Sequence, residues 1–173
     1  FRALIRELDV AYMTADTPYL TKGVQTRFTV HATGGDGRYT YNFTVYRRTG
    51  TSGAFYLQAS AKGSRVNTYV FTPKSDSGQY VLLIRITDSA GSYIEWQSEV
   101  YESATHAAAR KAKSLAEECM READTDYARA LWLHDWLIKN AEYDHDYKYF
   151  YPEGVLLYGK GVCQSYALAY EML

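Results

Sequence analysis

The stretch QYVLLIRITD at residues 79–88 determines the fold expected for the first hundred residues. Four of its alternate positions are apolar, namely Tyr80, Leu82, Ile84 and Ile86. This period of two is typical of a β-strand. Because Val81 and Leu83 make the middle apolar on both faces as well, we expect a central strand of a sheet.

Similar segments lie on both sides of this strand. Residues 39–46 and 68–72 show the same alternation, and Ile94, Trp96 and Val100 mark a last strand. Runs rich in glycine, serine and aspartate separate the segments, at residues 33–37, 49–53, 73–78 and 88–91. About six or seven strands with a turn roughly every ten residues favour an all-β sandwich of two sheets.

The patterning changes to a helical one after residue 102. Residues 103–123 are rich in alanine, lysine and glutamate, and one face carries Ala108, Ala112, Leu115 and Cys119. A second helix is expected from Thr125, a good N-cap, to Ala141. A tyrosine-rich loop at 143–158 and a last helix from Cys163 follow. We therefore expect two domains, at residues 1–102 and 103–173.

Helix 125–141 places a histidine among apolar positions. Its expected buried face carries Tyr127, Leu131, His134, Ile138 and Ala141. Such a histidine either packs in the core or acts as a base, and packing is the expectation here.

Composition excludes several classes of function. A net charge of −1 excludes a nucleic-acid or membrane-surface partner held by bulk charge. No apolar run is long enough to cross a bilayer, so no membrane insertion is expected. Two cysteines make no disulfide framework. No cofactor and no metal site are expected, because His145 has no second histidine or cysteine at ligand spacing.

Cys163 lies in a pattern suited to a nucleophile. The segment GKGVCQSYA at 159–167 reads as a turn, a cysteine and a helix. A thiol at the first turn of a helix faces free backbone N–H groups that favour the thiolate and can hold an oxyanion. Other free cysteines are simply small core residues, which is the expectation for Cys119.

The first domain resembles bacterial immunoglobulin-like surface domains. The resemblance rests on the motifs GGDGRYTY at 34–41, YVFTP at 69–73 and GQY at 78–80, followed by TDSAG at 87–91. Such domains are spacers or binding modules, so the resemblance implies an extracellular or cell-surface location.

Residues from about 128 to 173 resemble the start of a bacterial transglutaminase-like (kyphoscoliosis-peptidase-related) domain. The motifs are LHDWL at 133–137, Tyr143-Asp144 and GVCQSYA at 161–167, with Ser165 where many members have glycine. The resemblance implies the helical N-terminal part of an α+β, papain-like domain, with Cys163 as nucleophile. It also implies a catalytic histidine and aspartate after the cysteine helix, whereas all four histidines of this chain precede it. We expect a truncated domain that is inactive by itself.

Other residues near Cys163 have two readings. Gln164, Gly161 and Tyr158 are candidates for an oxyanion site or a substrate groove. The five loop tyrosines either line that groove or pack the loop. They are Tyr143, Tyr147, Tyr149, Tyr151 and Tyr158.

The function predicted is part of a secreted or cell-surface thiol enzyme, either a peptidase or an acyl transferase, acting on a protein, peptide or cell-wall substrate. The alternative is a non-catalytic adhesion module that keeps the transglutaminase-like shape. An unpaired apolar face in residues 104–173 would also allow a homodimer.

Overall fold

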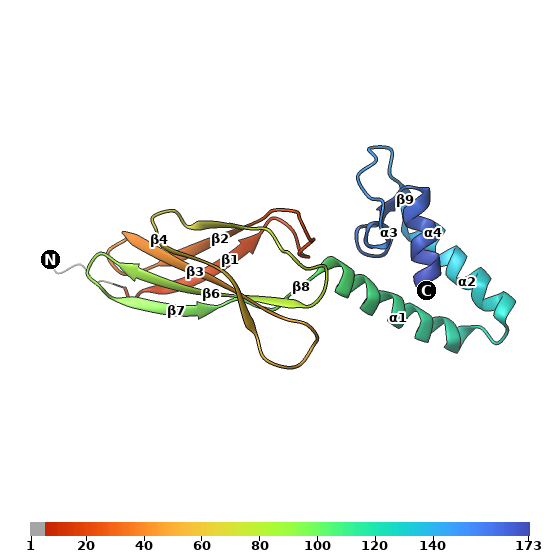
Figure 1. The fold of residues 1–173 in the computed structure, drawn as a ribbon, viewed down its shortest axis with the longest axis horizontal. Coiled ribbons are helices and arrows are strands. Elements are labelled where there is room, and N and C mark those ends of the chain that lie inside the picture. Colours follow the sequence, from red (N-terminus) through yellow and green to blue (C-terminus); the bar gives the residue numbers. More distant parts are fainter. Residues whose placement is uncertain (1–5) are drawn as a thin grey trace. The chain divides into compact units, whose positions relative to one another are not determined.

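The computed structural model describes residues 6–173 and divides them into two compact units (Figure 1). The first unit ends at Ser103 and the second spans Ala104–Leu173. The sequence pattern changes at the same place. The fold is a β-sandwich in the first unit and a helical segment in the second, as the patterning predicts.

The sandwich consists of two antiparallel sheets. One has the strand order β1-β2-β5, and the other has the order β4-β3-β6-β7 with β8 paired to β6. The strands are β1 (Asp9–Ala15), β2 (Thr26–Thr33), β3 (Tyr39–Arg48), β4 (Tyr56–Ser64), β5 (Thr68–Phe71), β6 (Gln79–Asp88), β7 (Tyr93–Gln97) and β8 (Tyr101–Glu102). Strand β6 lies between β3 and β7, so the central strand predicted from its two apolar faces is confirmed.

Alternate residues of the strands fill the space between the sheets. The β3 side chains Tyr41, Phe43 and Val45 are buried, and the Phe43 ring stacks on Tyr69 of the opposite sheet at 5.2 Å between centroids. The last predicted strand is shorter than expected, because Val100 is exposed and lies between β7 and β8.

The second unit contains four helices among short strands. These elements are α1 (Ala104–Glu122), α2 (Asp126–Asn140), β9 (Glu142–Tyr143), α3 (Pro152–Tyr158), β10 (Lys160–Gly161) and α4 (Cys163–Met172). Thr125 caps α2, since its hydroxyl oxygen accepts a hydrogen bond from the N–H of Ala128 at 3.2 Å. Cys119 is buried on the same face of α1 as Leu115, as expected.

Helix α3 was not predicted. The segment 143–158 was expected to be a loop throughout, but its last seven residues are helical. Pro152 occupies the first turn, where a missing N–H costs nothing, and Gly159 ends the helix in the left-handed conformation at φ 65°. Val155 and Leu156 are buried against the other helices, and this burial stabilises so short a helix.

The predicted buried face of α2 is wrong in part. Leu131, His134 and Ile138 are exposed, and Leu137 is the buried residue of the helix. His134 lies 3.2 Å from a carboxylate oxygen of Asp135 at the surface instead of packing in the core. Apolar spacing along α2 therefore does not coincide with the face that is buried within the second unit.

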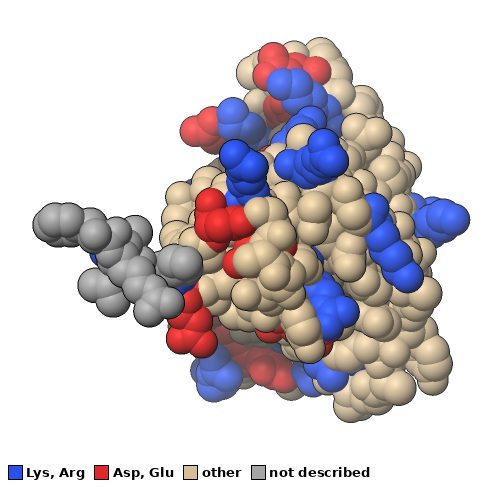
Figure 2. All heavy atoms as spheres, turned by 90° about the vertical axis from the view of Figure 1, so that its left-hand side faces the viewer, with Lys and Arg blue, Asp and Glu red and all other residues tan. Residues whose placement is uncertain are grey.

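The surface carries charges of both signs. Figure 2 shows basic and acidic side chains interspersed on the face that it presents. No helix within residues 6–173 is both long enough and apolar enough to span a membrane.

Candidate active site

Cys163 is the exposed first residue of α4. Val162 before it has extended backbone angles (φ −81°, ψ 173°) and serves as the N-cap without a side-chain hydrogen bond. The first N–H groups of an α-helix have no partner within the helix, and their partial positive charge favours a nearby anion. The thiol therefore lies at the N-terminal end of a helix.

The backbone before Cys163 is fixed by a short parallel strand pair. Tyr143 of β9 lies opposite Gly161 of β10, and the N–H of Asp144 donates to the Gly161 carbonyl at 3.0 Å. One residue later, the N–H of Val162 donates to the carbonyl of Tyr149 at 3.1 Å. The two residues before Cys163, Gly161 and Val162, are thus each held by a backbone hydrogen bond to the loop that follows α2.

Tyr143 is the tyrosine whose hydroxyl lies near the cysteine. Cys163 is close enough to this hydroxyl to influence its pKa. Desolvation raises the pKa of the Tyr143 hydroxyl, and the nearby Cys163 and Tyr147 raise it further. The hydroxyl therefore stays protonated at neutral pH.

Asp144 organises the turn that follows Tyr143. The carboxylate is 4% exposed and accepts hydrogen bonds from three backbone N–H groups, those of Asp146 (3.1 Å), Lys148 (2.6 Å) and Tyr149 (2.9 Å). Burial raises the pKa of this carboxyl, but the three N–H donors outweigh burial and lower the pKa below 3.8. The sequence reading used Asp144 only as part of the Tyr-Asp motif. Aspartate often accepts hydrogen bonds from backbone N–H groups a few residues ahead of it in a turn, and this tendency was the signal in the sequence.

Ser165 joins the tyrosine loop to the cysteine helix. Its side chain is fully buried, and its hydroxyl donates to the carbonyl of Tyr151 at 2.5 Å. A glycine, which the resemblance implies at this position, would lack this bond. The serine therefore makes a contact of its own.

The other candidate residues have different surroundings. Gln164 is exposed beside Cys163. Gly161 is buried, and a Cβ added there would lie 2.6 Å from both Ser165 Oγ and Val155 Cγ2, so its missing side chain makes room for core atoms rather than for a substrate. Tyr158 is half-buried and stacks on Tyr149 at 5.3 Å between ring centroids.

The loop tyrosines thus divide into two groups. Tyr149 and Tyr158 pack against each other, whereas Tyr143, Tyr147 and Tyr151 are exposed. The packing reading applies to Tyr149 and Tyr158. For the three exposed tyrosines the groove reading stays a prediction. The exposed subset includes the tyrosine whose hydroxyl lies near Cys163.

One histidine of the loop lies beside Tyr143. The ring of His145 is 5.2 Å from the ring of Tyr143, centroid to centroid, at an interplanar angle of 56°. Within residues 6–173, no group of three or more His, Cys, Asp or Glu side chains is arranged to hold a metal ion.

Comparison with known proteins agrees with the assignment of the second unit. Residues 113–173 match the family model of the transglutaminase-like superfamily. This part of the chain is therefore transglutaminase-like, as its motifs indicated, and Cys163 lies within it.

Solved structures similar to this chain cover about half of it. One is described as an Fn3-like protein from Clostridium thermocellum, with 16% identity and a TM-score of 0.32 over 53% of this chain and 85% of that chain. Another, titled "Myokine structure", has 9% identity and a TM-score of 0.32 over 54% of this chain and 87% of the other. No curated protein matches the chain.

Proposed function

We propose that the chain is part of a transglutaminase-like thiol enzyme in which Cys163 is the nucleophile. The observation that carries the proposal is the exposed thiol at the N-terminus of α4, near the Tyr143 hydroxyl and inside the matched residues 113–173. Cys119 also lies within residues 113–173, but it is buried in α1 and is not at the start of a helix.

The chemistry is acyl transfer through a thioester. The Cys163 thiolate attacks the carbonyl carbon of a peptide or side-chain amide, and the C–N bond breaks as the amine leaves with a proton. Water or an amine then attacks the thioester carbonyl and releases the thiolate. The Cys163 N–H and the Tyr143 hydroxyl lie where they can stabilise the oxyanion of each addition.

The proton transfers need a base that we do not assign within this chain. The resemblance implies a histidine and an aspartate after the cysteine helix, and residues 164–173 contain neither. Protein or peptide material is the proposed substrate class, and a secreted or cell-surface setting is proposed from the resemblance of the sandwich to surface modules.

Thiol reactivity tests the assignment. In a Cys119→Ser chain, iodoacetamide should alkylate Cys163 at about pH 6 faster than it alkylates N-acetylcysteine, because the helix N-terminus favours the thiolate. The matched Cys163→Ser chain, which retains the buried Cys119, should react far more slowly. If Cys163 reacts no faster than the free thiol, the nucleophile assignment fails and the non-catalytic adhesion module becomes the better reading.

A further inference from the structure

Tyr147 has a backbone conformation that a tyrosine rarely adopts. Its φ of 54° makes it the one non-glycine residue with positive φ among residues 6–173. Side chains with a Cβ clash with the backbone in this left-handed region, and an aromatic residue there is a conformational outlier. A glycine would adopt the same angles without strain.

The Asp144 turn holds Tyr147 in this conformation from both sides. Its carboxylate binds the N–H of Asp146 just before Tyr147 and the N–H groups of Lys148 and Tyr149 just after it. The N–H of Tyr147 itself donates to the Asp144 carbonyl at 3.3 Å. Because all four bonds converge on one residue, the turn is fixed independently of the Tyr147 ring.

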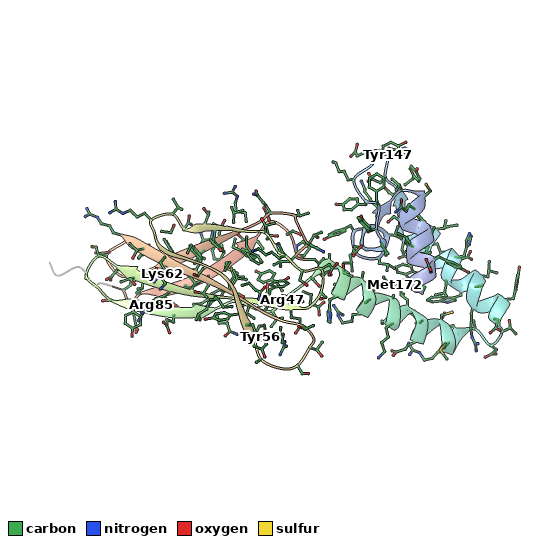
Figure 3. All side chains as sticks on the ribbon, viewed as in Figure 1. Arg47, Tyr56, Lys62, Arg85, Tyr147 and Met172 are labelled. Atoms are coloured by element: carbon green, nitrogen blue, oxygen red, sulfur yellow. The ribbon has the colours of Figure 1, made fainter. Side chains whose placement is uncertain are left out.

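Packing does not explain why a tyrosine occupies this position. Its side chain is 63% exposed at the tip of the loop between β9 and α3, where Figure 3 labels it. Its backbone N–H donates to the carbonyl of Asp144, so it lies in the turn directly after Tyr143, which is paired with Gly161 two residues before Cys163. Strained residues that gain no packing energy concentrate at functional sites.

We propose that Tyr147 determines substrate specificity at Cys163, forming with Tyr143 and His145 an aromatic wall for the acyl donor. The wall accepts an aromatic or large apolar side chain of a peptide, next to the carbonyl that Cys163 attacks. Asp144 is a positioning residue that acts through the turn. This inference rests on the proposed function of Cys163 and adds the class of acyl donor.

The rings of Tyr143 and His145 lie together and meet the chemical requirement for part of such a subsite. The His145 ring is tilted against the Tyr143 ring at 5.2 Å, so the two present a joint surface beside the thiol. Aromatic rings attract other rings and flat apolar groups in offset or edge-to-face arrangements. Tyrosine also provides contact area at a low cost in side-chain entropy.

Two peptide-like electrophiles test the proposal in the Cys119→Ser background. The probes are the fluoromethyl ketones of N-acetyl-phenylalanine and N-acetyl-alanine. With either probe, the Cys163 thiolate displaces fluoride and forms a thioether, so the ratio of the two rates reports side-chain preference alone. We expect the unmodified loop to prefer the phenylalanine probe, and Tyr147→Gly to lower that preference about two- to tenfold, the range expected for one aromatic contact.

Matched variants distinguish the effect of the Tyr147 ring from effects on the fold. Tyr147→Phe should keep the preference, and Tyr127→Ala, which removes another exposed tyrosine from α2, should leave it unchanged. Tyr147→Gly should have a higher thermal midpoint than Tyr147→Ala, because only glycine relieves the left-handed strain.

Three results would overturn the inference. They are no preference for the phenylalanine probe, a preference that Tyr147→Gly leaves intact, and a midpoint for the alanine variant equal to or above that of the glycine variant. Failure of the proposed function is a separate outcome, because Cys163 would then react no faster than a free thiol with iodoacetamide as well.

Discussion

The two units of this chain bury their apolar residues to different extents. The core of the sandwich consists of large aromatic and branched side chains such as Phe28, Phe43 and Ile84, none of which is accessible to solvent. The core of the helical unit includes Ala108, Ala112 and Ala169, while Leu131, Ile138 and Tyr170 are exposed.

This difference relates burial to function. A strand in a two-sheet sandwich buries alternate side chains between two complete layers, so the unit stabilises itself. The helical unit instead presents the Cys163 thiol and a turn of exposed tyrosines at its surface. Residues that act on other molecules need such access, and regions with a thin core open more readily than a closed sandwich.

Removing one ring from the sandwich core should have the largest effect on stability. Phe43→Ala leaves a cavity where the ring stacks on Tyr41 and Tyr69, and such substitutions cost about 3–5 kcal/mol. Urea unfolding followed by Trp96 fluorescence in a Trp132→Phe, Trp136→Phe background would measure the loss.

Leu115→Ala is the matched change in the second unit. It should cost about 2–3 kcal/mol, at the lower end for a buried leucine, because the neighbouring core residues are small. Circular dichroism at the helical wavelength follows this unit. If Phe43→Ala lowered the stability of the helices as much as that of the sandwich, the two units would not be independent.

Acid should weaken the helical unit through Asp144. The folded-state pKa of this carboxyl lies below 3.8, so its ionised form stabilises the folded state. That contribution is fully present above the unfolded-state value and is lost as the pH falls from there through the folded-state pKa.

Asp144→Asn isolates the effect of this carboxylate. Helix unfolding measured at about pH 6 and about pH 3 should show a smaller drop in stability for the asparagine variant than for the wild type, because only the wild type loses an ionised group there. Equal drops in both chains would contradict the assignment.

The smallest effect on stability is expected at the exposed apolar face of α2. Ile138 is 59% exposed, so Ile138→Lys should change the stability by less than about 0.5 kcal/mol. If this face mediates the proposed self-association, the same change should lower dimer formation in sedimentation experiments, whereas Val66→Lys on the sandwich should not. A wild-type chain that stays monomeric at all concentrations would contradict the proposed self-association.

Errors in the sequence reading have a common cause. Helix α3 was missed because a tyrosine-rich stretch with one proline suggests a loop, although Pro152 and Gly159 mark its two ends. His134 was expected in the core because periodicity shows that a face is apolar but not whether another element covers it.

The sequence by itself determined the sandwich, the helical segment and the placement of Cys163 at the start of a helix, because alternation, capping residues and turn motifs are local signals. Only the tertiary structure decided which residues surround the thiol. The pairing of β9 with β10 brings Tyr143 to Cys163 across about twenty residues, and the buried Asp144 carboxylate fixes the turn that carries Tyr147. Such contacts depend on how separate segments pack, which a local pattern does not encode.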